Sequence, residues 1–239
     1  MAEWVLFWGS LLTAFAPISA LFLLVVAQRA QLVILAITAA FFYLLGLLVA
    51  ATVWTAIPPL QTSIQATIPI SILIQELFRY LFFNVYVRCE LAVKKVTTKQ
   101  NQLPLNDLTT AFASGVGFAL MRALMLYGTV LAASVQGEGA AFTDSCPSVP
   151  LVFASALSTL ALTLMDVALM IVAFEGFRKK SVAHIAAVVL IHLGSGLSNM
   201  LNLNEVGCKA SIPLTYVATA LAVAAAMLTL KRSSMASFP

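Results

Sequence analysis

The sequence predicts an all-α polytopic membrane protein, a single domain of seven transmembrane helices over residues 1–239. Three observations predict it: a very apolar composition, long uninterrupted apolar runs, and basic residues confined to alternate loops. Of the 239 residues, 62% are hydrophobic and only 9% are charged. Soluble domains carry about 25% charged residues, so this chain has too little polar surface to face water on all sides.

The apolar runs divide into seven spans, each close to the ~20 residues that a helix needs to cross hydrocarbon. The expected spans are 4–27, 32–57, 67–87, 109–135, 150–174, 182–203 and 211–230. Because backbone groups in lipid must be satisfied internally, and because the runs are continuous instead of alternating, each span is expected to be a helix.

Residues at the borders of the runs support this division. Pro58-Pro59 ends the second run, so residues 58–66 are expected to be a loop, and Pro147 and Pro150 precede the fifth. Asp107 and Ser181 are suited to capping the fourth and sixth helices. The first run lacks a basic segment before it and is too long for a cleaved signal peptide, so we expect a permanent span.

Basic residues predict the orientation. One side carries ten of them: Arg29, Arg88, Lys94, Lys95, Lys99, Arg178, Lys179, Lys180, Lys231 and Arg232. The opposite side carries only Lys209. The positive-inside rule then places the N-terminus in the lumen or outside the cell and the C-terminus in the cytosol. The excess of basic residues, a formal net charge of +4, therefore reflects the topology of the chain. It gives no reason to expect nucleic acid as a partner.

The three cysteines divide according to this topology. Cys146 and Cys208 fall in lumenal loops, and Cys89 falls in a cytosolic loop. An oxidising compartment favours a disulfide between Cys146 and Cys208, and the alternative is two free thiols at helix ends.

Five side chains that can carry charge lie inside the spans: Glu76, Arg79, Arg122, Asp166 and His192. At ~1.5 Å per residue, they lie about 12–20 Å from the cytosolic ends of their spans. They are therefore expected to form one layer slightly cytosolic of the midplane, with Gln75 beside them. Charged groups in hydrocarbon require partners. Glu76 and Arg79 are neighbours at i, i+3, and we predict an ion pair between Arg122 and Asp166.

Small residues recur every four positions in the fourth span, at Gly115, Ala119 and Ala123, and Arg122 projects from nearly the same face. Such rows allow helices to approach closely in lipid. The row is expected to pack either within this chain or against another subunit.

Catalytic chemistry is not evident in the sequence. His192 and Ser195 share one helix without a third group to orient the imidazole. An intramembrane aspartyl protease needs two facing carboxylates, whereas Glu76 and Asp166 each have an arginine as counter-ion. There is no metal motif such as HExxH. We therefore expect no catalytic residue, no metal and no cofactor.

Six stretches carry a resemblance to a known family: LLTAFAPISALFLLVVA (11–27), QELFRYLFFNVYVR (75–88), SGVGFALMRA (114–123), VAFEGF (172–177), HLGSGLSNMLN (192–202) and EVGCKASIPLTY (205–216). Together with seven spans, they resemble the anterior-pharynx-defective (Aph) subunit of γ-secretase.

The resemblance implies a non-catalytic scaffold that holds presenilin, which carries the catalytic aspartates, together with nicastrin and the presenilin enhancer subunit. The assembled enzyme cleaves single-span membrane proteins within the bilayer, a step in protein processing and Notch signalling. The resemblance also implies residence in endoplasmic reticulum, Golgi, plasma or endosomal membranes, in contact with membrane lipid.

Two positions depart from the family pattern. The family places a GxxxGxxxG row in the fourth span, whereas this chain has Gly115, Ala119 and Ala123. The family also places a histidine in each of two neighbouring spans, and here the first of these positions is Asp166. Arg122 supplies the counter-charge that an aspartate needs, which indicates a compensating exchange.

A different class of function also fits a layer of polar side chains. A small-solute or proton transporter could line a pathway with Glu76, Arg122, Asp166 and His192. The absence of evident inverted repeats in the sequence argues against it.

Overall fold

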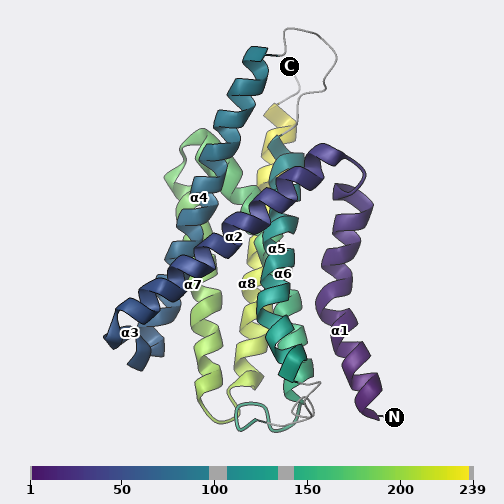
Figure 1. Ribbon diagram of the computed structural model, residues 1–239, viewed down its shortest axis with the longest axis vertical. Coiled ribbons are helices and arrows are strands. Elements are labelled where there is room, and N and C mark those ends of the chain that lie inside the picture. The colour runs from purple at the N-terminus through teal and green to yellow at the C-terminus, as the bar shows by residue number, and fades with distance from the viewer. Residues whose placement is uncertain (1, 97–106, 134–142, 237–239) are drawn as a thin grey trace.

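The computed structural model describes residues 2–96, 107–133 and 143–236, and long helices make up most of it (Figure 1). In chain order the elements are α1 (Ala2–Leu21), a π-helical turn (Phe22–Val26), α2 (Ala30–Ala56), α3 (Pro58–Thr62), α4 (Ile64–Val96), α5 (Asp107–Ala133), α6 (Leu151–Lys179), α7 (Val182–Asn199), a 3₁₀ turn (Met200–Leu203) and α8 (Cys208–Ala236). Lys99 and the last two residues of the predicted fourth span, 134–135, lie outside the described residues.

Seven helices in the described ranges are long and apolar enough to cross a membrane, with lengths of 22 to 30 residues. The predicted fold class is therefore confirmed. The helices run beyond several predicted span limits, most of all α4, which continues past residue 87 to Val96. A helix does not stop where hydrocarbon ends unless the chain supplies a stop signal, and none is present there.

The predicted loop at 58–66 is wrong for most of its length. Ile57 does end α2 in an extended conformation, as expected before proline. Pro58 and Pro59 then occupy the first turn of the short helix α3, where the missing N–H groups have no helical acceptor to lose. α4 begins at Ile64 and contains Pro69 near its start.

The two residues predicted to cap helices lie at the starts of α5 and α7. Asp107 begins α5, and Ser181 precedes α7 at the N-cap position. The Ser181 hydroxyl bonds the His184 ring at 2.8 Å and does not cap the helix backbone.

α6 is the central helix of the bundle. Of its most apolar stretch, 72% is buried, against 17–44% in the other spans. It contacts α1, α4, α5, α7 and α8, while α2 crosses α5 obliquely in front of it (Figure 1). Asp166, in the middle of α6, is therefore surrounded by protein on all sides.

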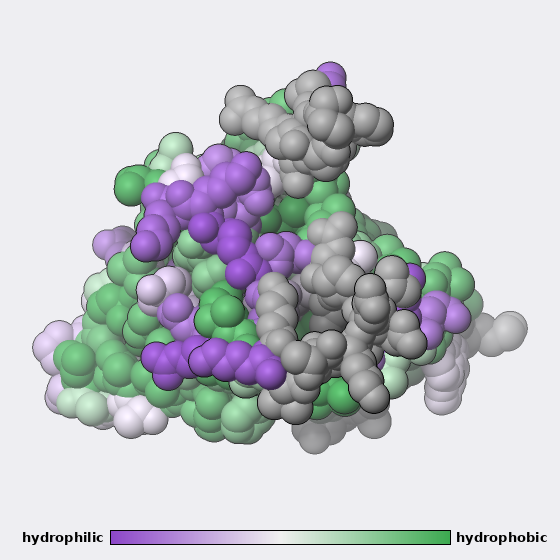
Figure 2. All heavy atoms as spheres, turned by 90° about the horizontal axis from the view of Figure 1, so that it is seen from above, coloured by the Kyte–Doolittle hydropathy of each residue, from purple (hydrophilic) through white to green (hydrophobic). Residues whose placement is uncertain are grey.

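The two ends of the bundle differ in charge. α1, α4, α6 and α8 all run toward the upper end in Figure 1. We call it the basic end, because basic residues gather there. Its basic residues include Arg29, Arg88, Lys95, Arg178, Lys180 and Lys231. Figure 2 views this end and shows hydrophilic side chains gathered among hydrophobic flanks. We call the opposite end, which carries Cys146 and Cys208, the disulfide end.

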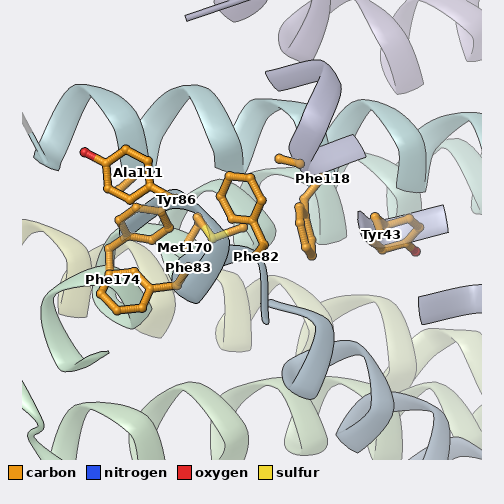
Figure 3. Packing of buried hydrophobic residues seen from close by; sticks show 9 residues of the cluster. Tyr43, Phe82, Phe83, Tyr86, Ala111, Phe118, Met170 and Phe174 are labelled. Carbon is orange, nitrogen blue, oxygen red and sulfur yellow. The ribbon is translucent and has the colours of Figure 1, made fainter. Parts of the chain in front are cut away.

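An aromatic cluster fills the bundle between its middle and the basic end (Figure 3). Phe82 of α4 lies 6.4 Å from Phe118 of α5 and 6.1 Å from Phe174 of α6, measured between ring centroids. Tyr43 of α2 joins the cluster through Phe118 at 5.6 Å. Because α2, α4, α5 and α6 all contribute rings, the cluster fixes how the four helices sit beside one another.

Candidate functional site

α4, α5, α6 and α7 bring six polar side chains together in the middle of the bundle. We define them as the polar layer: Gln75, Glu76, Arg79, Arg122, Asp166 and His192. The five ionisable members are 0–8% exposed. The structure therefore brings together the residues that were grouped in the sequence by their depth along the predicted spans.

Asp166 is the centre of the polar layer. Arg122 donates to it through Nε and, at 3.3 Å, through Nη2, so the two side chains predicted to pair are in contact. Arg79 donates to the same carboxylate through Nη2 at 2.9 Å. This second arginine was not foreseen for Asp166. Arg79 also bonds Glu76, its i, i+3 neighbour, through Nη1 at 2.6 Å.

His192 closes the polar layer into a ring. Its Nε2 lies 3.0 Å from Arg122 Nη2, and its Nδ1 lies 2.5 Å from Glu76 Oε1. A guanidinium only donates hydrogen bonds, so Nε2 must accept, and Nδ1 must carry the proton that it donates to Glu76. With a neutral imidazole, two arginines and two carboxylates leave the ring without net charge.

Aromatic faces cover both guanidinium groups. Arg79 lies 5.6 Å from the ring centroid of Phe118, and Arg122 lies 5.6 Å from that of Tyr43. These are cation–π distances. Tyr43 and Phe118 were missed in the sequence because a single aromatic residue in an apolar span has no distinguishing pattern.

The row of small residues on α5 packs within this chain. A Cβ atom on Gly115 would lie 2.9 Å from the Val167 Cα of α6. Ala119 belongs to the same buried cluster as Val167, and Ala123 has no exposed surface. Of the two alternatives for this row, the structure shows packing against the chain's own helices.

A covalent clasp joins the loops of the disulfide end. Cys146 and Cys208 form a disulfide with their Cα atoms 5.4 Å apart, while Cys89 is a free, exposed thiol. Two backbone bonds reinforce the clasp, from Val206 N to Asp144 O at 2.9 Å and from Cys208 N to Ser145 O at 3.0 Å. The loop before α6 is thereby tied to the start of α8.

A cavity of 470 Å³ lies between the polar layer and the disulfide. Arg122 and His192 line it on one side, and Cys146 and Cys208 line it on the other. This cavity was not predicted from the sequence. The one available signal was Ser155, Ser158 and Thr159, hydroxyl residues that share a face of the fifth span.

The geometry offers little for bond-breaking chemistry. Both carboxylates of the layer are bound by arginine, and His192 is held between Arg122 and Glu76. The Ser195 hydroxyl has no hydrogen-bond partner among the described residues, so no base activates it there. Within the same residues, no three His, Cys, Asp or Glu side chains are placed to hold a metal ion.

The fold and the polar layer define a class: a seven-span helical membrane protein whose intramembrane charges are paired with one another. The sequence model of the family described as "Aph-1 protein" matches residues 5–233 of the chain. The chain belongs to the Aph-1 family.

Curated relatives agree with this assignment. "Gamma-secretase subunit Aph-1" of Drosophila melanogaster is 29% identical over 215 residues, covering 90% of this chain and 88% of that protein. "Gamma-secretase subunit APH1-like" of Arabidopsis thaliana is 27% identical over 220 residues, covering 89% of this chain and 88% of that protein. "Gamma-secretase subunit APH-1B" of Homo sapiens is 27% identical over 196 residues, covering 78% and 75%.

Proposed function

We propose that this chain is a non-catalytic scaffold subunit of a γ-secretase-like intramembrane protease. In this role it holds presenilin, nicastrin and the presenilin enhancer subunit together, and the catalytic aspartates belong to presenilin. The complex then cleaves single-span membrane proteins in endoplasmic reticulum, Golgi, plasma or endosomal membranes. The names of the Drosophila, Arabidopsis and human relatives support membership of such a complex.

The observation that carries the scaffold role is the closed ring of the polar layer. Each charged group in it contacts at least one group of opposite charge. The neutral imidazole of His192 contacts Glu76 and Arg122. A general acid or base needs a proton that can be exchanged with substrate, whereas these groups are occupied with one another. Such a ring fixes four helices relative to each other and thereby shapes the outer faces that partners contact.

Partner contacts are expected on the outer faces of the bundle, because the small-residue row of α5 is covered from within. α7 is the most open helix, with 17% of its most apolar stretch buried, and it exposes Val182, Leu190 and Leu197. In lipid such faces suit either acyl chains or the helices of other subunits.

Affinity purification in a mild detergent, followed by mass spectrometry, tests this function. We expect stoichiometric presenilin, nicastrin and enhancer subunit with the wild-type chain. His192→Ala opens the ring and should reduce their recovery, whereas His184→Ala, at the basic end, should not. Recovery of the wild-type chain alone, free of these subunits, contradicts the proposal.

A transporter is the second candidate, and two cavities favour it. The 470 Å³ cavity lies on one side of the polar layer, and a cavity of 180 Å³ beside Glu76 and Tyr80 lies on the other. The smaller cavity is otherwise lined by apolar residues such as Phe177 and Val188, which do not suit a hydrophilic solute. Solute or proton flux into proteoliposomes containing only this chain would support transport and count against the scaffold.

A further inference from the structure

The cavity between the polar layer and the disulfide has the size and lining of a ligand site. Its 470 Å³ falls within the ~300–1,000 Å³ that is typical of small-molecule pockets. Hydroxyl and amide groups from several helices face it, among them Ser71, Ser155, Ser158, Thr159, Ser195 and Asn199. The proposed scaffold role makes no use of this cavity.

The charge of the lining is one-sided. Arg122 is the charged side chain among the described lining residues, and no aspartate or glutamate is among them. The two carboxylates of the polar layer, Glu76 and Asp166, lie behind Arg122 and His192 and do not line the cavity. A cation in the cavity would therefore face a guanidinium of the same charge. An anion would face a hydrogen-bond donor of opposite charge.

Arg122 is held in place with one nitrogen unused. Its Nε and Nη2 bond Asp166, Gln75 and His192, which fixes the plane of the guanidinium. Within 2–96, 107–133 and 143–236, its Nη1 has no hydrogen-bond partner. A guanidinium that is already oriented loses little entropy on binding an oxyanion, which its planar donors match.

Ser195 supplies a second unused group on the same cavity. Its side chain is 0% exposed, and its Oγ has no partner among the described residues. Buried hydroxyls are nearly always hydrogen-bonded. Ser195 lies three residues after His192 on α7, so both side chains project from the same face of that helix. The Ser195 Oγ therefore bonds a ligand or solvent atom of the cavity once its side chain turns toward it.

We propose that this cavity binds an anionic oxygen group, a phosphate or a carboxylate, through Arg122 Nη1 and Ser195 Oγ. Two sources share this chemistry: a small soluble anion entering from the disulfide end, and the head group of an anionic phospholipid. The hydroxyls of the cavity wall provide further donors for whichever oxygen atoms the two main contacts leave free.

The first test measures binding to the full chain. Calorimetric titration with sodium phosphate in a neutral detergent examines the soluble source. Native mass spectrometry after release from nanodiscs of phosphatidylglycerol and phosphatidylcholine examines the lipid source. Ser195→Ala should weaken binding about tenfold, since a hydrogen bond to a charged group is lost. The matched variant Ser198→Ala, one turn along α7, should bind as wild type because its hydroxyl bonds Ser195 O and Thr215 instead of lining the cavity.

The second test measures the sign of the preferred charge. In a Cys89→Ala background, Ser195→Cys is treated with anionic and cationic methanethiosulfonates. The rate at which each reagent modifies the cysteine is divided by the rate at which the same reagent modifies a free thiol in solution. We expect the anionic reagent to react faster, and we expect phosphate to slow it.

These results separate the two sources and decide the proposal. Phosphate binding with protection of the cysteine assigns a soluble anion, and selective retention of phosphatidylglycerol without phosphate binding assigns a lipid head group. Retention of neither probe, faster reaction of the cationic reagent, or equal binding by Ser195→Ala and wild type would overturn the site.

Discussion

The two halves of the bundle on either side of the polar layer are built differently. Toward the basic end, rings such as Phe82, Phe118 and Phe174 fill the space between helices. Toward the disulfide end, hydroxyl and amide side chains surround a 470 Å³ cavity. One half is therefore filled by aromatic side chains, whereas the other encloses a cavity and carries a covalent bond at its rim.

The glycines of α5 show the same difference within one helix. A Cβ atom on Gly117, toward the basic end, would overlap the Ala36 carbonyl of α2. A Cβ atom on Gly128, toward the disulfide end, would meet nothing within 4 Å. α5 is thus in closer contact with a neighbouring helix at Gly117 than at Gly128.

The outer rims repeat the contrast. At the basic end, Arg178 of α6 bonds Glu90 of α4 at 2.9 Å and also bonds Asp107 of α5. At the disulfide end, the disulfide between Cys146 and Cys208 links the loop before α6 to the start of α8. A covalent link between loops can hold helices together around an enclosed space without filling that space.

The largest effect is expected at the boundary between the halves. Asp166→Asn leaves two buried arginines facing one carboxylate, and losing a partner of a buried pair typically costs about 3–5 kcal/mol. Asp166→Asn with Arg122→Gln should be less destabilised than Asp166→Asn alone. Unfolding by denaturing detergent, monitored for all variants in a double-mutant cycle, measures this coupling. Purely additive effects would show that the contact between the two side chains contributes nothing.

A smaller effect is expected from removing the clasp. Cys146→Ser with Cys208→Ser should lower the free energy of unfolding by about 2–4 kcal/mol, since the bond restricts the unfolded chain. Reducing the wild type should reproduce the loss, and Cys89→Ser should change stability by less than about 0.5 kcal/mol. If the double variant melts with the wild type, the disulfide end does not depend on its covalent link.

The contrast within α5 can be sharpened with two matched substitutions. Gly117→Ala should destabilise by about 1–3 kcal/mol, because overpacking forces α2 and α5 apart. Gly128→Ala adds the same methyl group where there is room, and its effect should stay within about 0.5 kcal/mol. Thermal unfolding of both variants in one detergent makes the comparison. Equal losses at the two positions would mean that the halves do not differ in packing.

The smallest effect is expected at the cavity wall. Ser195→Ala removes a hydroxyl without a partner among the described residues, so stability should change by less than about 0.5 kcal/mol. Ser198→Ala removes a hydroxyl that donates to Ser195 O at 2.7 Å and should cost about 1 kcal/mol. The difference in melting temperature between the two variants is the readout, and a larger loss for Ser195→Ala would indicate a contact within the fold.

The seven spans could be predicted because hydrocarbon thickness sets a minimum length for each apolar run. Helix ends could not, because they depend on local backbone signals. α4 continues to Val96 through a basic segment that is compatible with helix, and α3 forms where two prolines had indicated a loop. Orientation relative to the membrane stays a prediction from the basic residues.

The polar layer was predictable as a set, because counting residues from the span ends gives depth. The partners within it were less so, since contacts also depend on how each helix is rotated and tilted. Arg79 meets an aspartate 87 residues away, and Tyr43 covers Arg122 from a span without a charged residue. The cavity is a gap left between five helices, the 3₁₀ turn and the loop before α6, and no single stretch of sequence encodes it.

The order of the charges along the chain has a consequence for biosynthesis. Asp166, which both arginines share, follows Arg79 by 87 residues and Arg122 by 44. At about 5–20 residues per second, the ribosome delivers the aspartate roughly 4–17 s after Arg79. During that interval the third and fourth spans carry cations that only Glu76 can offset. An arrangement that keeps these two spans away from lipid until the fifth emerges is therefore favoured.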